Sequence, residues 1–127
     1  MPAGKYNIEV EAGAGLTLRF AFTDQNGDPI PFAEGTTAEF QARTVARAPG
    51  RPILRLTEDE TEHGSITVDA ADGIVWLHMT DEGTRLFDKP DRSPAVYAIE
   101  VYEPDKDTRR FVEGRITCLP EIVRPVS

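Results

Sequence analysis

The chain has 127 residues, of which 39% are hydrophobic, with a formal net charge of −8 and a single cysteine. This length favours one domain built around one hydrophobic core. A lone cysteine excludes an internal disulfide and a zinc site made of several cysteines. A sequence pI near 4.7 disfavours nucleic acid as a partner, because a negatively charged protein repels the phosphate backbone.

Membrane and export signals are not evident in the sequence. No stretch reaches the roughly 18 apolar residues of a membrane-spanning helix. The opening residues "MPAGKYNIEV" lack the apolar run of a signal peptide. We therefore expect a protein that is made in the cytoplasm and has no membrane partner.

Alternation of apolar and polar residues, which is typical of half-buried strands, runs through most of the chain. In "GLTLRFAFTD" it places Leu16, Leu18, Phe20 and Phe22 on one face. The same pattern predicts strands in "YNIEV" (6–10), "GLTLRFAFTD" (15–24), "TAEFQAR" (37–43), "ILRLT" (53–57), "SITVD" (65–69), "GIVWLHM" (73–79), "AVYAIEVYEP" (95–104) and "RRFVEGRITC" (109–118). Asn26-Gly27 and Asp72-Gly73 predict tight turns, the second of them inside a hairpin.

A single short helical stretch is expected in "DEGTRLF", with Thr80 as its N-cap. About 7 to 9 short strands with regular turns predict an all-β fold, an antiparallel sandwich in one domain spanning residues 1–127. Residues 1–5 are expected to form an N-terminal arm and residues 120–127 a C-terminal docking segment. The expected core residues are Leu18, Phe20, Phe22, Phe40, Leu77 and Ile99.

The sequence offers few residues for catalysis or cofactor binding. His63 lies in an acidic turn and His78 alternates with inward residues, so the two do not form a ligand pair. "DQNGD" (24–28) resembles part of a calcium loop, but turn formation explains the same residues. We therefore expect no enzyme activity, no cofactor and no metal.

Arginines recur every fourth residue from Arg43 through Arg47 and Arg51 to Arg55. On a helix this spacing would make a basic stripe for phosphates. Pro49, Gly50 and Pro52 interrupt any helix in this region. The pattern instead indicates a basic loop patch that pairs with acidic groups of a partner, or a plain solvated surface.

The last third of the chain resembles a family of phage tail-associated, immunoglobulin-like virion proteins. The resemblance is carried by "GIVWLHMTDEGTRLF" and "VYAIEVYEPDKDTRRFVEGRITCLPEIVR". The positions that match the family pattern are Gly73, Thr80, Thr84, Tyr97, Glu100, Gly114, Pro120, Glu121, Val123 and Arg124. Val123 departs from the Thr that such tails often carry, and the loop around "KPDRSP" is longer than the pattern needs.

The resemblance implies an immunoglobulin-like β-sandwich and a non-enzymatic structural role in a phage or phage-like particle. The chain would be an adaptor in the tail, baseplate or fibre-attachment region of the virion. Its partners would be other virion subunits, in several copies around a symmetry axis. A receptor-binding or carbohydrate-binding module, with Trp76, His78, Tyr97 and Tyr102 as its aromatic platform, is an alternative, and so is a capsid decoration protein.

The residues that follow the last expected strand have an apolar and basic character. Pro120 ends the hydrogen-bonded ladder, and Ile122 to Val126 either bind a neighbouring subunit or fold back on the same sandwich. The expected partner-binding residues are Ile122, Val123, Arg124, Arg47, Arg51, Trp76 and His78.

Overall fold

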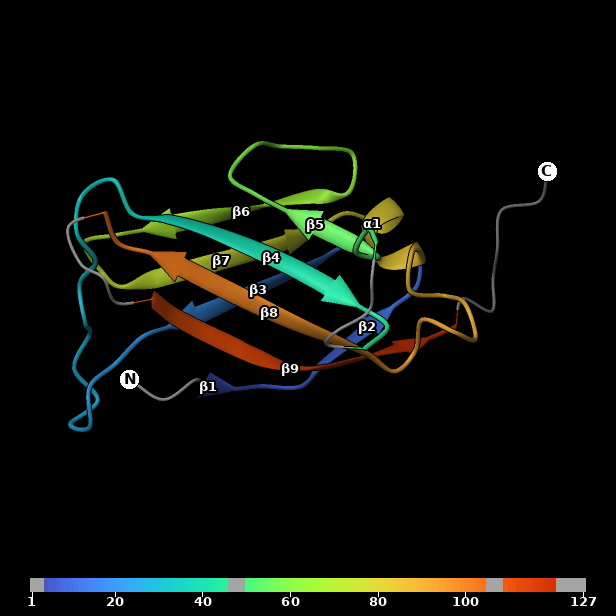
Figure 1. Cartoon of the computed structure of the whole chain (residues 1–127), viewed down its shortest axis with the longest axis horizontal. Coiled ribbons are helices and arrows are strands. Elements are labelled where there is room, and N and C mark those ends of the chain that lie inside the picture. Colours follow the sequence, from blue (N-terminus) through green and yellow to red (C-terminus); the bar gives the residue numbers. More distant parts are fainter. Residues whose placement is uncertain (1–3, 46–49, 105–108, 121–127) are drawn as a thin grey trace.

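The computed structural model describes residues 4–45, 50–104 and 109–120, with the backbone alone for residues 109–111. Figure 1 shows the strands arranged in two layers, with the helix at one end. The elements are β1 (Gly4–Lys5), β2 (Ile8–Glu11), β3 (Leu16–Ala21), β4 (Thr37–Arg43), β5 (Leu54–Leu56), β6 (Gly64–Asp69), β7 (Ile74–Met79), α1 (Asp81–Arg85), β8 (Ala95–Tyr102) and β9 (Arg109–Leu119).

The two layers are a larger and a smaller β-sheet. The larger sheet has the order β1-β9-β8-β4-β5, with β2 also paired to β9, and the smaller has the order β3-β7-β6. Figure 1 shows β4, β8 and β9 lying in front of β3, β6 and β7. The expected all-β sandwich with one short helix is therefore confirmed.

The pairing of the first two strands differs from the antiparallel arrangement expected throughout. β1 and β2 both run parallel to β9, whereas the other strand pairs are antiparallel. Gly4 and Lys5 pair with Val112 and Glu113. The expectation of an N-terminal arm is therefore wrong for residues 4 and 5, and residues 1–3 lie outside the described residues.

Turn chemistry explains the expected reversals. Gly27 has φ of 84°, and Asp24 accepts the Gly27 N–H at 3.0 Å, which closes the expected turn. Gly73, with φ of 65°, lies where a Cβ atom would come within 2.2 Å of the Ile30 carbonyl oxygen. β6 and β7 on either side of this turn pair as the predicted hairpin.

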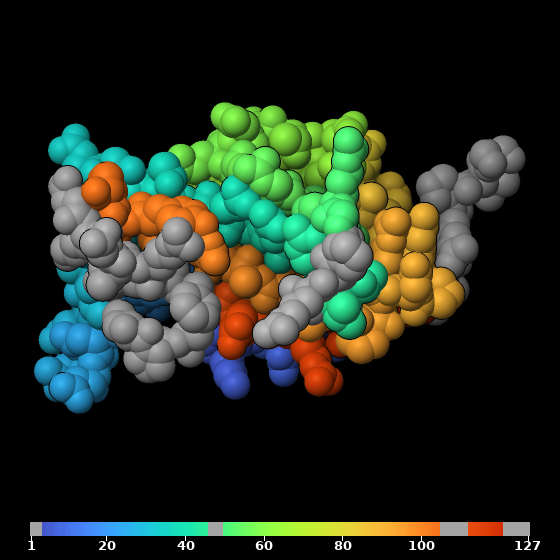
Figure 2. Space-filling view, viewed as in Figure 1, coloured from blue at the N-terminus to red at the C-terminus, as the bar shows by residue number. Residues whose placement is uncertain are grey.

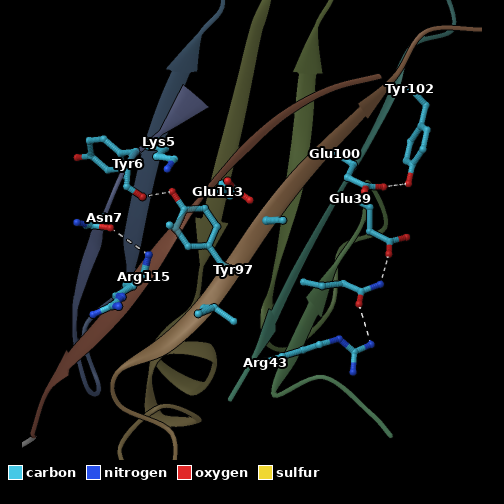
Figure 3. Close-up of a pocket in the computed structure, with 14 residues that line it drawn as sticks. Lys5, Tyr6, Asn7, Glu39, Arg43, Tyr97, Glu100, Tyr102, Glu113 and Arg115 are labelled. Atoms are coloured by element: carbon cyan, nitrogen blue, oxygen red, sulfur yellow. Dashed lines mark hydrogen bonds between the residues drawn. The ribbon is translucent and has the colours of Figure 1, made fainter. Parts of the chain in front are cut away.

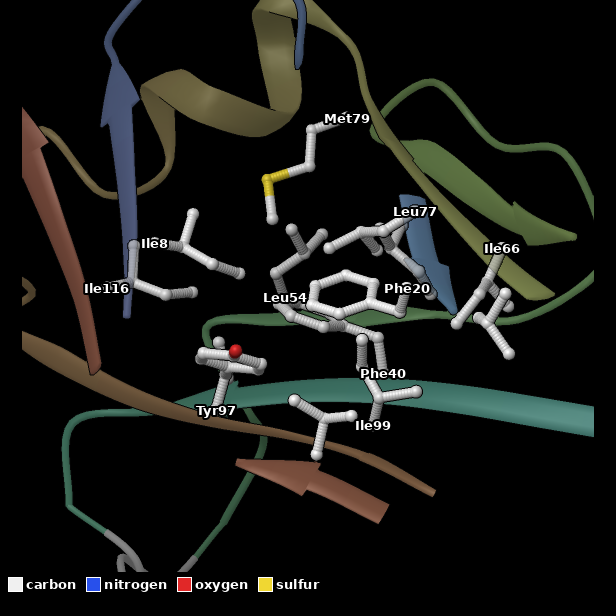
Figure 4. Packing of buried hydrophobic residues seen from close by; sticks show 14 of the residues in the cluster. Ile8, Phe20, Phe40, Leu54, Ile66, Leu77, Met79, Tyr97, Ile99 and Ile116 are labelled. Atoms are coloured by element: carbon white, nitrogen blue, oxygen red, sulfur yellow. The ribbon is translucent and has the colours of Figure 1, made fainter. Parts of the chain in front are cut away.

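Residues from both sheets form one core. Phe40, Leu77 and Ile99 are completely buried and Phe20 is 9% exposed, whereas Leu18 and Phe22 are partly buried against them. Figure 4 shows Leu77 and Ile66 of the smaller sheet meeting the side chains of the larger sheet. The predicted inward faces are confirmed, and apolar packing holds the two sheets together in place of a disulfide.

The short helix α1 packs on two neighbouring turns. Thr80 caps it, as expected, by accepting the Gly83 N–H at 3.1 Å, but the helix ends at Arg85 rather than residue 87. A Cβ atom at Gly83 would lie 2.2 Å from the His63 carbonyl oxygen. Buried Thr84 accepts the Gly13 N–H through its hydroxyl at 3.1 Å. These contacts close one end of the sandwich.

Replacing Phe40 with Ala tests the assignment of the core. We expect the free energy of unfolding to fall by about 3–5 kcal/mol, because the change leaves a cavity in a region that excludes water. Thr37→Ala, at an exposed position of the same strand, is the control and is expected to change stability by less than about 1 kcal/mol. Urea denaturation followed by circular dichroism measures both, and equal losses would contradict the assignment.

Candidate functional site

The candidate site lies on the outer face of the larger sheet. Its side chains come from alternate positions of β4, β8 and β9, because the intervening residues face the core. Strand register sets them in rows across the sheet. The rows begin with Glu39 and Glu100, continue with Gln41, Ala98 and Glu113, and end with Arg43, Val96 and Arg115.

Short side chains along β8, between longer ones on β4 and β9, leave a depression in this face. Val96 and Ala98 are short and half-buried, whereas the flanking residues on β4 and β9 have long side chains. The resulting depression, here called the β8 trough, has a volume of about 630 Å³. Figure 2 shows this face from outside, with β8 (orange) between β4 (turquoise) and β9 (red). The residues that line the trough are Lys5, Tyr6, Asn7, Glu39, Gln41, Arg43, Val96, Tyr97, Ala98, Glu100, Tyr102, Glu113, Gly114 and Arg115.

A chain of hydrogen bonds orders the β4 side of the trough. Arg55 of β5 donates to Glu39 Oε1 at 2.7 Å. Gln41 also donates to Glu39 and accepts from Arg43, which in turn donates to the Gly50 carbonyl at 2.8 Å. The hydrogen bond from Arg55 lowers the pKa of the Glu39 carboxyl below its ordinary value, so Glu39 is ionised at neutral pH.

Two carboxylates lie side by side at one end of the trough. Glu39 and Glu100 are direct register partners on β4 and β8, and like charges in that relation repel. Tyr102 donates its hydroxyl proton to Glu100 Oε2, as Figure 3 shows. Among the described residues, Arg55 is ion-paired with Glu39 and no ion pair involves Glu100. The described side chains therefore make this end of the trough acidic and its opposite end, at Arg43 and Arg115, basic.

Tyr97 and Asn7 stabilise a break in pairing where the first strands pass the trough. Between β1 and β2 the Arg115 N–H donates to Asn7 Oδ1 at 3.1 Å instead of to a backbone carbonyl. The Tyr97 hydroxyl donates to the Tyr6 carbonyl, and Figure 3 shows its ring directed at Tyr6. Gly114 permits this approach, because a Cβ atom there would lie 2.0 Å from the Tyr6 oxygen. Burial raises the pKa of the Tyr97 phenol well above its ordinary value.

A second, flatter surface lies on the outer face of the smaller sheet. Trp76 is 38% exposed and stands in register between Arg19 of β3 and Thr67 of β6. His78 is also exposed, and its Nδ1 lies 3.0 Å from the Thr17 hydroxyl. The prediction that Trp76 and His78 share an outward face is confirmed.

The structure corrects the proposed four-residue aromatic platform. Tyr97 faces the core at 3% exposure, and Tyr102 lies on the outer face of the larger sheet. Trp76 and His78 lie on the other sheet. The four side chains therefore do not form one surface. The sequence did not reveal this, because alternation within each strand does not specify which sheet the strand joins.

The arginine series is divided by the fold. Arg43 and Arg55 hydrogen-bond within the outer face of the larger sheet rather than forming a free loop patch. Arg51 is exposed beside this face, and Arg47 lies outside the described residues. Ile122, Val123 and Arg124 also lie outside them, so their predicted role stays a prediction.

The remaining candidate residues have local structural roles. Asp24 Oδ1 accepts the N–H groups of Asn26 and Asp28 at 2.9 and 3.0 Å, as the turn interpretation requires. Residues 4–45, 50–104 and 109–120 contain no group of three His, Cys, Asp or Glu side chains suited to a metal ion. The helix among these residues is not long or apolar enough to span a membrane. Cys118 is half-buried, and burial raises the pKa of its thiol.

The trough was not recognised from the sequence, although one signal for it was present. In residues 95–102 the outward positions begin with the short side chains of Val96 and Ala98 and end with Glu100 and Tyr102. The depth of the hollow depends on long side chains from β4 and β9, and the sequence pattern does not specify that these two strands flank β8.

Tyr97→Phe tests the hydrogen bond to Tyr6. We expect a loss of about 1–2 kcal/mol at neutral pH, because a part-buried carbonyl loses its donor. The folded pKa lies above the unfolded value of about 10, so the contribution of Tyr97 to stability is present below that pH and is lost as the pH rises beyond it. Denaturation of both proteins across this range should therefore show the stability difference shrinking at high pH. A constant difference would contradict the role of the phenol proton.

Comparison with known proteins bears on the fold. No protein-family model matches the chain, and no curated protein sequence matches it. A solved structure named Tim-1 matches with a TM-score of 0.52 and 14% identity, covering 98% of this chain and 100% of that one. The M1 domain from titin matches with a TM-score of 0.46 and 14% identity, covering 96% and 95%. Together with the two sheets described above, the likeness to Tim-1 makes the fold of this chain an all-β immunoglobulin-like sandwich.

Proposed function

We propose that this chain is a non-enzymatic structural component of a phage or phage-like particle, an adaptor of the tail, baseplate or fibre-attachment region. It acts through protein–protein contacts with other subunits of the particle. The observation that carries the proposal is the β8 trough, a hollow with ordered walls and charges of opposite sign at its two ends. Ordered side chains lose little conformational freedom when a partner binds, which favours recognition at this face.

The residues that carry the resemblance to phage virion proteins also support the proposal. Gly73 and Thr80 form a turn and a helix cap, and Tyr97 and Gly114 meet at the strand break. These positions account for the fold. Glu100, in contrast, lines the trough, so this pattern position is available to a partner.

Filling the trough tests the proposal. Ala98→Arg places a long side chain on its floor, and we expect the variant to fold but to be lost from assembled particles. The matched control is Ala21→Arg, which makes the same change at an exposed position of β3 in the other sheet. Density-gradient sedimentation of particles from producing cells, followed by immunoblotting for the chain, measures incorporation. Absence of the wild-type chain from every particle fraction, or normal incorporation of Ala98→Arg, would count against the proposal.

A receptor-binding or carbohydrate-binding module is the second candidate, and the exposure of Trp76 favours it. An aromatic ring bordered by polar side chains can stack on a sugar, and Thr67 and His78 flank the ring on this face. Trp76 is the only tryptophan of the chain, so its fluorescence reports directly on this surface.

The carbohydrate candidate predicts a change in tryptophan emission during titration with glycans. We expect galactose- or N-acetylglucosamine-containing oligosaccharides to shift the emission to shorter wavelength, because a stacked sugar displaces water from the ring. His78→Ala should weaken the response, whereas Ala98→Arg on the other sheet should leave it unchanged. An emission spectrum that no glycan in the panel alters would exclude this candidate in favour of the adaptor.

A further inference from the structure

We propose that the β8 trough of one copy of the chain binds residues 121–124, "EIVR", of a second copy. The inference rests on the proposed assembly function and names the partner of the trough. Arg124 would lie at the acidic end of the trough and Ile122 on its floor. Charge, spacing and reach each support this placement.

Among the described side chains at the acidic end of the trough, carboxylates outnumber cations. Glu39 and Glu100 are register partners, and Arg55 pairs with Glu39. Glu100 receives the Tyr102 hydroxyl, and no ion pair to it occurs in the described part of the chain. An arginine entering from outside would neutralise the second carboxylate and relieve the repulsion between the two strands. Arg124 supplies such a group.

The spacing of the segment matches the spacing of the trough. On β8, Ala98 and Glu100 are two residues apart and point to the same face. In an extended peptide, Ile122 and Arg124 are also two residues apart and point the same way. When Arg124 lies at Glu100, Ile122 therefore lies over Ala98.

The position of Arg124 also sets the direction of the segment. One residue further back than Ile122, Glu121 comes level with Tyr97 and, by the same alternation, points away from the floor of the trough. With Ile122 over Ala98 and Arg124 at Glu100, the segment would run parallel to β8 and place its basic residue at the acidic end of the trough. Reversing the segment about Ile122 would bring Arg124 level with Arg43 and Arg115, so that like charges would face one another.

The segment of the same copy is too short to reach its own trough. Glu100 is in register with Phe111 of β9, which is nine residues before Pro120. At the rise per residue of a strand, the distance from Pro120 back to the position of Glu100 is roughly 30 Å. Four extended residues from Pro120 to Arg124 span at most about 14 Å. The arginine side chain does not cover the difference, so the contact joins two copies.

Such a contact is heterologous, since the segment of one copy meets a different surface on the next. Repetition of a heterologous contact generates a closed ring if the rotation between copies closes, and an open filament if it does not. A rotation of 180° between copies would close the assembly as a dimer in which each segment occupies the trough of the other copy, and other rotations would give larger assemblies.

Charge reversal on the two sides of the contact tests the proposal with the full chain. We expect Glu100→Lys and Arg124→Glu each to weaken self-association by roughly tenfold or more, because each sets like charges against one another. The double variant restores the opposite pair and should recover association. The matched control is Glu9→Lys, an exposed position of β2 outside the trough. Sedimentation velocity over a concentration series measures association, and thermal unfolding verifies that each variant is folded.

Three results would overturn the inference. The first is a wild-type chain that stays monomeric throughout the series, and the second is a double variant whose self-association is not restored. The third is a monomeric chain that Arg124→Glu destabilises, because that result would place the segment on its own sandwich. Where Glu100→Lys does not fold, Glu100→Gln takes its place and should still weaken association.

Incorporation into particles separates the trough contact from the adaptor function. If both charge variants are incorporated normally, the trough contact fails and the adaptor function stands. If the chain self-associates as expected but is absent from particles, the trough contact stands and the adaptor function fails.

Discussion

The alternation of side chains along β8 is the constraint on which both the core and the candidate site depend. Ala95, Tyr97, Ile99 and Val101 point inward and are buried. The residues between them point outward and form the floor and the acidic end of the β8 trough. A one-residue shift of this strand would place the outward set in the core, so the register that stabilises the sandwich also positions the trough.

Tyr97 links these two sides of the larger sheet. Its ring stacks on Phe40 in the core, with ring centroids 5.7 Å apart, while its hydroxyl reaches the backbone at the rim of the trough. Gly114 leaves space for this contact, and Asn7 satisfies the N–H group that the break in pairing leaves. The position of the first strands beside the trough therefore depends on a side chain anchored in the core.

Much of the fold could be predicted from the sequence, because alternation and turn residues are local signals. They predicted the hairpin of β6 and β7, the inward faces of β4 and β8, and the cap at Thr80. They did not predict that β1 and β2 run parallel to β9. The partners there, such as Asn7 and Arg115, are 108 positions apart, and alternation is the same for either direction of pairing. The trough was not predicted for the same reason, since its walls come from strands that are distant in sequence.

The short side chains of Val96 and Ala98 have a consequence for how such a protein can diverge. Both lie on the outer face of a strand whose inner residues pack in the core. Substitutions at these two positions would alter the depth of the hollow without changing the volume of the core. Lineages that share this sandwich could therefore acquire new partners by exchanging two residues, at little cost to folding.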